Sequence, residues 1–159
     1  MTGESPERQL AAFMARYTPE VARVARAART KLRRLLPWAL ELVYDNYNAL
    51  VIGFGPTERA SDAILSIALY PRWVSLFFLQ GARLPDPSGL LRGRGSRVRS
   101  IVVEHPSLLD AAAVRQLIDE AVARAPVAID PSQRKRNRLI VKSVSAKQRP
   151  RRPGKTRRR

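Results

Sequence analysis

Five short apolar segments follow one another in the middle of this chain, with no helical segment between them. They are rich in Val, Ile, Leu and aromatic residues, which favour β-strands, and turn residues separate them. The spacing predicts strands over residues 42–47, 50–54, 63–70, 73–79 and 97–104. Because successive strands joined by short turns pair antiparallel, we expect a meander in the sheet.

Amphipathic helical segments flank these strands. Thr18 can cap a helix, Pro19 suits its first position, and apolar residues then recur every three or four positions up to residue 36. A shorter amphipathic helix is expected upstream over residues 10–17, and a last helix is expected over residues 107–125. Helices that flank strands, rather than alternate with them, indicate an α+β domain. We therefore expect an antiparallel sheet of about five strands with helices packed on one face, over residues 1–133.

Positive charge is concentrated at the C-terminal end of the chain. Residues 134–159 hold 13 of the 30 Lys and Arg residues and none of the 13 acidic residues. From Gln148 onward the segment has prolines, a glycine and no apolar residue, so burial cannot offset the entropy of ordering it. We expect residues 134–159 to be a basic, mostly disordered tail. Residues 138–144 are partly β-branched and could add an edge strand.

Several residue types that carry chemistry are scarce. The chain has no cysteine and one histidine, His105, which excludes disulfides, thiolate zinc sites and sites that need two imidazoles. No Ser-His-Asp pattern is legible, and we expect no enzyme activity, no catalytic residue, no metal and no cofactor. The first twenty residues lack a secretory signal, and apolar stretches are too short to span a bilayer. We expect the protein to be located in the cytoplasm.

A loop rich in arginine and glycine is the first candidate site. Two flexible glycines stand beside four guanidinium groups that could converge on a phosphate or a carboxylate. The residues are Arg92, Gly93, Arg94, Gly95, Arg97 and Arg99. The alternative is a glycine turn before a strand, with the arginines on the surface.

A second candidate is a small pocket at one end of the sheet. In an extended segment Glu41, Asp45 and Tyr47 share one face, and two carboxylates could support acid–base or metal chemistry. The alternative, which we favour, is an ordinary solvated strand face with Tyr44 in the core. Trp38, Trp73 and Phe77 could stack on bases, but aromatic residues at such positions favour the core.

The region from residue 73 to residue 99 carries a longer pattern. A strand ends in aromatic residues and a glycine, Leu-x-Asp-Pro and Leu-Leu-x-Gly-x-Gly follow, and an arginine leads into the next strand. The residues are Phe77, Phe78, Gly81, Leu84, Asp86, Pro87, Leu90, Leu91, Gly93, Gly95 and Arg99, with Glu41 and Tyr44 as an earlier Glu-x-x-Tyr match. In these residues the chain resembles the YdhG-like, or DUF1801, domain family over about residues 17–125.

The resemblance implies a sandwich related in shape to frataxin and identifies no reaction. Some members of the family are described as intracellular iron chaperones, so a frataxin-like iron chaperone or a small-molecule-binding domain is the alternative function. In this chain the predicted helix over residues 18–36 carries Glu20 as its single acid among six cations. The electrostatic field of this helix is therefore positive, which disfavours an iron cation.

The excess of basic residues indicates an anionic partner. We expect the tail to bind nucleic acid electrostatically and without sequence preference, with an acidic protein as a possible other partner and no membrane contact. The oligomeric state stays open. The expected contacts are Arg134, Lys135, Arg136, Arg138, Lys142, Lys147, Arg149, Arg151, Arg152, Lys155, Arg157, Arg158 and Arg159.

Overall fold

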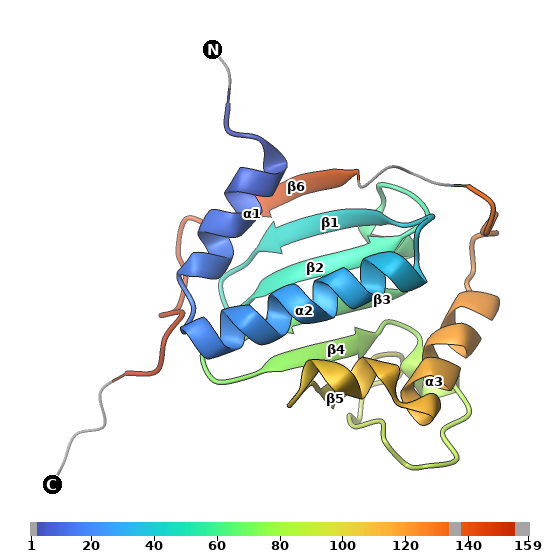
Figure 1. Cartoon of the computed structure of the whole chain (residues 1–159). Helices are drawn as coiled ribbons and strands as arrows, with labels where there is room; N and C mark the ends of the chain where they lie inside the picture. Colours follow the sequence, from blue (N-terminus) through green and yellow to red (C-terminus); the bar gives the residue numbers. More distant parts are fainter. Residues whose placement is uncertain (1–2, 134–137, 155–159) are drawn as a thin grey trace, which may run out of the picture.

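The computed structural model of the chain describes residues 3–133 and 138–154 (Figure 1). Two helices precede five strands, and a third helix and a sixth strand follow. The helices are α1 (Pro6–Ala15), α2 (Pro19–Leu35) and α3 (Ala112–Ala123), with short 3₁₀ helices η1 (Ala60–Asp62), η2 (Gly81–Arg83) and η3 (Pro106–Asp110). The strands are β1 (Leu40–Asp45), β2 (Leu50–Gly55), β3 (Leu65–Leu69), β4 (Val74–Phe78), β5 (Arg99–Val102) and β6 (Leu139–Val144).

The six strands form one sheet in the order β5-β4-β3-β2-β1-β6. β1 to β5 pair antiparallel with their neighbours in the sequence, which confirms the predicted meander. β6 pairs with β1 in parallel, with a register shift between Val43 and Tyr44. The fold is therefore α+β, with one strand more than the meander alone supplies.

All three helices lie on the same side of the sheet (Figure 1). α2 begins at Thr18, whose hydroxyl oxygen accepts a hydrogen bond from the Val21 N–H at 3.3 Å. The apolar stripe of α2 packs into one core with the inward side chains of the strands, such as Ile67, and its members Ala28 and Leu32 are fully buried. In residues 3–133 and 138–154, no helix is long and apolar enough to span a membrane.

The C-terminal segment is more ordered than its composition predicts. The predicted edge strand over residues 138–144 is confirmed as β6, where Leu139 is buried against the core. The prediction of disorder from Gln148 onward is wrong for residues 148–154, because one arginine of that segment is built into the protein interior. Residues 155–159, also expected to be disordered, lie outside the described residues.

That arginine is Arg151, which is 4% exposed. Its Nη2 donates to Asp45 Oδ1 at 2.9 Å, and Asp45 is itself 1% exposed. The guanidinium also donates to the carbonyl of Asn46 and lies 5.8 Å from the centre of the Tyr17 ring. Burial raises the pKa of Tyr17, whose hydroxyl accepts a hydrogen bond from the Leu50 N–H at 3.0 Å.

Neighbouring residues fasten the same segment to the sheet and to α1. The Gln148 amide donates to the Asp45 carbonyl at 3.0 Å, and the Arg149 N–H donates to the Tyr47 carbonyl at 2.9 Å. The Arg152 guanidinium donates at 3.1 Å to the carbonyl of Arg16, at the end of α1. Residues 145–152 thus close the Asp45 end of the sheet, and we call this segment the C-terminal clamp.

Arg151→Ala should destabilise the protein by about 3 to 5 kcal/mol, because it leaves the Asp45 carboxylate buried without its main partner. Urea unfolding followed by circular dichroism measures the change. Arg149→Ala is the matched control: its side chain is exposed, its backbone hydrogen bond survives, and we expect a change within about 0.5 kcal/mol. Equal unfolding midpoints for the two variants would show that the ion pair does not hold the clamp.

Candidate functional site

Glu41 lies inside an ion-pair network and not on a solvated strand face. Glu41 is 2% exposed, and its carboxylate accepts a hydrogen bond from Arg29 Nε at 2.6 Å and forms an ion pair with Arg33 Nε at 3.0 Å. Arg29 also bridges to Glu7 of α1 at 2.8 Å. Because α1 and α2 cover this face of β1, the carboxylate needs cationic partners. The favoured prediction of a solvated strand face is therefore wrong.

The three residues of the expected pocket are not brought together. Asp45 is paired with Arg151 in the C-terminal clamp, and Tyr47 is 51% exposed in the turn after β1. Tyr44 is partly buried on the opposite face of β1. Within the described residues, no group of three or more His, Asp or Glu side chains could hold a metal ion. Glu41 and Asp45 act as structural carboxylates in this arrangement.

The aromatic side chains divide between the core and the surface. Trp38 is buried, as predicted, but the prediction for Trp73 is wrong: it is 43% exposed and stacks on Tyr70, with ring centroids 4.8 Å apart. Its Nε1 donates to the Ser75 hydroxyl at 3.1 Å. The two-residue turn before β4 places Trp73 on the side of the sheet away from the helices. Phe77 lies on the same side, is partly buried and is not part of the core, so the prediction for Phe77 is also wrong.

The arginine-glycine loop uses much of its hydrogen-bonding capacity on itself. Arg92 Nη1 donates to the Gly89 carbonyl at 2.7 Å, and Arg99 Nη1 donates to the Val98 carbonyl at 2.8 Å. The Asp86 carboxylate, part of the Leu-x-Asp-Pro sequence, accepts from the N–H groups of Leu90 and Leu91. Arg94 is exposed. These contacts give the loop an internal frame instead of four guanidinium groups aimed at one anion.

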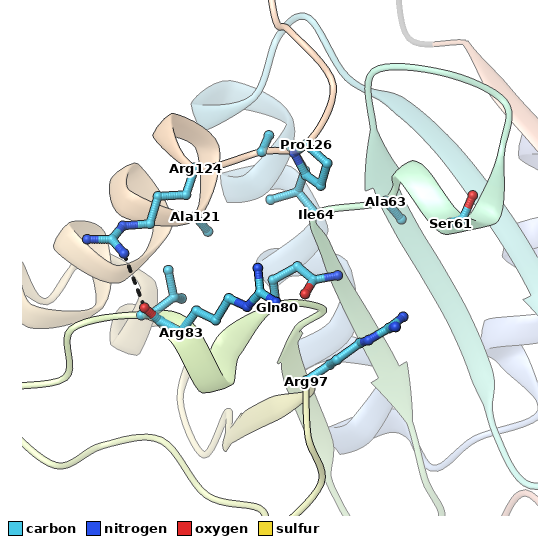
Figure 2. Close-up of a pocket in the computed structure, with 11 residues that line it drawn as sticks. Ser61, Ala63, Ile64, Gln80, Arg83, Arg97, Ala121, Arg124 and Pro126 are labelled. Atoms are coloured by element: carbon cyan, nitrogen blue, oxygen red, sulfur yellow. Dashed lines mark hydrogen bonds between the residues drawn. The ribbon is translucent and has the colours of Figure 1, made fainter.

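Arg97 differs from the other arginines of that loop, because it lines a cavity (Figure 2). The cavity has a volume of about 490 Å³ and opens between η1, η2 and the C-terminal end of α3. We call it the arginine-lined cavity. Its lining consists of Ser61, Ala63, Ile64, Gln80, Arg83, Leu84, Arg97, Ala121, Arg124, Ala125 and Pro126.

Two hydrogen bonds hold the segments that carry these arginines next to one another. The Ala82 N–H donates to the Arg97 carbonyl at 2.8 Å, which ties the loop to η2. Arg124 Nη1 donates to the Arg83 carbonyl at 3.2 Å, which ties α3 to η2 (Figure 2). The three arginines come from three separate elements, so sequence reasoning found Arg97 and missed Arg83 and Arg124. No local pattern marks a site that only long-range folding assembles.

The arginine-lined cavity has an electropositive side and an apolar side. Figure 2 shows Gln80, Arg83 and Arg97 together on one side, facing Ala63 and Pro126 on the other. None of the described lining residues is acidic. Such an arrangement can hold an anion that carries an apolar or planar group.

The cations expected to contact nucleic acid differ in exposure and in the partners they have within the chain. Lys142, Lys147 and Arg149 are exposed, and Arg138 forms an exposed ion pair with Glu58 at 3.0 Å. Arg151 is buried, so its assignment to nucleic-acid binding is wrong. The guanidinium of Arg152 is exposed and donates to α1 carbonyls. The expected contacts outside the described residues are Arg134, Lys135, Arg136, Lys155, Arg157, Arg158 and Arg159.

Comparison of the chain with models of known protein families, with curated proteins and with solved structures gave no match. The likeness to the YdhG-like family therefore stays a prediction that rests on its motif residues.

Gly93→Ala should destabilise the protein by about 1 to 3 kcal/mol, because Gly93 has φ +132° and a Cβ there would lie 3.2 Å from the Val98 carbonyl oxygen. Gly95→Ala is the control, since a Cβ at Gly95 meets nothing within 4 Å. Thermal unfolding of both variants measures the difference. A Gly93 variant as stable as the Gly95 variant would remove the conformational role of Gly93.

The bridge from Glu7 to Arg29 should make stability depend on acid pH. The hydrogen bond from Arg29 lowers the pKa of Glu7, so the unfolded chain binds the proton more readily and the bridge stabilises the fold above the usual glutamate range. As pH falls from about 6 to about 3, the melting temperature of the wild type should drop more than that of Glu7→Gln. Glu4→Gln, which alters an exposed acid without a described ion pair, should follow the wild type. Parallel pH profiles for all three proteins would contradict this role of Glu7.

Proposed function

We propose that this chain is a non-enzymatic nucleic-acid-binding protein that contacts phosphates through its C-terminal segment without reading sequence. The observation that carries the proposal is the charge of residues 134–159, which hold 13 cations and no acid. A segment of that charge density on DNA or RNA releases condensed counterions, and this release favours binding to any sequence.

The described part of the segment supports this proposal by the way it presents its cations. β6 forms an edge of the sheet, and Lys142 lies on it with its side chain exposed. Lys147 and Arg149 follow in the C-terminal clamp and are exposed as well. Because the Arg151 ion pair anchors this segment, the exposed cations are held along one edge and lose less entropy on binding than free side chains on a disordered arm.

The acidic residues support a binding role over a catalytic one. Glu41 and Asp45, the two buried carboxylates, are each engaged by arginines at 3.0 Å or less. A general base or metal ligand needs an oxygen that faces substrate or ion. In this chain the Glu41 carboxylate and Asp45 Oδ1 hold α2 and the C-terminal clamp against β1, and Asp45 Oδ2 is buried 3.7 Å from the Arg16 guanidinium.

The salt dependence of binding to duplex DNA tests the proposal. If about five to eight cations contact phosphates, log K against log salt should have a slope of about −4 to −7, with micromolar affinity near physiological salt. A chain that ends at Gly154 lacks four cations, Lys155 and Arg157 to Arg159. It keeps every contact that the structure describes. Its slope should be shallower by about 2 to 3, with an unchanged melting temperature.

A charge-matched pair of variants shows whether the segment is the binding element. The triple variant Lys142→Gln, Lys147→Gln, Arg149→Gln should weaken binding and reduce the slope by about 2. The control Arg26→Gln, Arg59→Gln, Arg115→Gln removes the same charge at exposed positions elsewhere and should weaken binding less. If both triple variants lose affinity equally, net charge and not the C-terminal segment determines binding. If the full chain shows no salt-dependent binding, the proposed function is wrong.

A further inference from the structure

The arginine-lined cavity has no part in the electrostatic contact just proposed, and its charge points to a distinct ligand. Arg124 is compensated by Glu120, whose carboxylate lies 2.9 Å from Arg124 Nε. Arg83 and Arg97 have no ion pair with an acid among the described residues, and both side chains line the cavity. The cavity therefore presents about two uncompensated positive charges.

Two charges favour a phosphate monoester over a singly charged anion. A monoester carries a charge of about −1.5 to −2 at pH 7, because its second pKa is about 6. A carboxylate or an internal phosphodiester of a nucleic-acid strand carries only one charge. Arginine guanidinium groups also bond phosphate oxygens in a bidentate manner. The hydrogen bond from the Ala82 N–H to the Arg97 carbonyl holds the backbone of η2 next to that of the loop, so Arg83 and Arg97 extend from neighbouring segments.

The rest of the lining indicates what the phosphate is attached to. Opposite the arginines, Ala63, Ile64 and Pro126 supply an apolar wall against which a flat ring can pack (Figure 2). Gln80 adds an amide, with one acceptor and two donors, beside the arginines. A volume of about 490 Å³ lies in the range of sites for small organic ligands.

We propose that the arginine-lined cavity binds a phosphorylated nucleoside, with its terminal phosphate on Arg83 and Arg97 and its base against the apolar wall. The same chemistry occurs in a free nucleoside 5′-monophosphate and in the 5′-phosphorylated end of a strand. The site does not depend on the C-terminal segment, so it stands even where the proposed nucleic-acid binding fails.

Calorimetry on the full chain tests the proposal with adenosine 5′-monophosphate and uridine 5′-monophosphate as probes. Both should bind at least about tenfold more tightly than the nucleosides, than inorganic phosphate and than the cyclic 3′,5′-monophosphates, which carry one charge. Affinity for the open monophosphates should fall several-fold between about pH 7.5 and pH 5.5, as the phosphate gains a proton. Binding that is equal for monoester and cyclic diester would overturn the assignment of a dianion site.

Single substitutions then locate the site. Arg97→Gln and Arg83→Gln should each weaken monophosphate binding at least about tenfold while leaving the melting temperature unchanged, since neither side chain has a described ion pair. Arg94→Gln removes the same charge from the same loop outside the cavity lining and should bind like the wild type. Monophosphate binding that is unaffected in both cavity variants, or absent in the wild type, would overturn the proposal.

Short oligonucleotides distinguish the two sources. A trinucleotide with a 5′-phosphate that competes with the monophosphate, where the same trinucleotide with a 5′-hydroxyl does not, assigns the site to strand ends. Failure of both trinucleotides to compete assigns it to free nucleotides. The wild type and Arg97→Gln should bind a duplex with 5′-hydroxyl ends with the same slope of log K against log salt. This comparison distinguishes binding at the cavity from binding at the C-terminal segment.

Discussion

Two carboxylates on the covered face of β1 constrain the rest of this structure. Glu41 and Asp45 lie under the helices, where an unpaired charge is costly, so each requires an arginine at close range. α2 supplies Arg29 and Arg33 to the first, and the C-terminal clamp supplies Arg151 to the second. These ion pairs join α1, α2 and the C-terminal clamp to one strand, in addition to the apolar contacts of the core.

The same constraint divides the arginines by role. A composition of 30 basic and 13 acidic residues suggests a surface that is positive everywhere, yet several arginines never reach a partner outside the chain. Arg29 and Arg151 neutralise buried acids, and Arg92 and Arg99 hold a loop together through its carbonyls. The cations left for binding are therefore fewer than the 30 basic residues of the sequence. Exposed cations lie on the β6 edge, in the C-terminal clamp and in the arginine-lined cavity, and others lie elsewhere on the surface, such as Arg26, Arg59 and Arg115.

Local patterns made most of the fold predictable. The period of α2, its cap at Thr18 and the succession of β1 to β5 depend on neighbours in sequence, and the structure confirms all of them. Apart from the aromatic residues on the outer face of the sheet, the errors concern contacts between distant residues. Asp45 and Arg151 are 106 positions apart, and a proline-rich basic segment gives no local sign that one arginine is buried. The cavity was missed for the same reason, since Arg83, Arg97 and Arg124 become neighbours only when η2, the loop before β5 and α3 pack together.

Strand register places the two basic features at opposite ends of the sheet. Asp45 pairs with Leu50, so the C-terminal clamp closes that end, whereas Leu65 pairs with Phe78 at the end where the cavity opens between Ile64 and Gln80. The two features share no described contact, and they suit different anions, a row of singly charged diesters and one doubly charged monoester. Substitutions at distant sites without shared partners add in free energy. A nucleic-acid strand whose 5′-phosphate occupies the cavity while its backbone follows β6 would break that additivity. The coupling free energy between Arg97 and Lys142 substitutions in nucleic-acid binding therefore reports whether one ligand contacts both features.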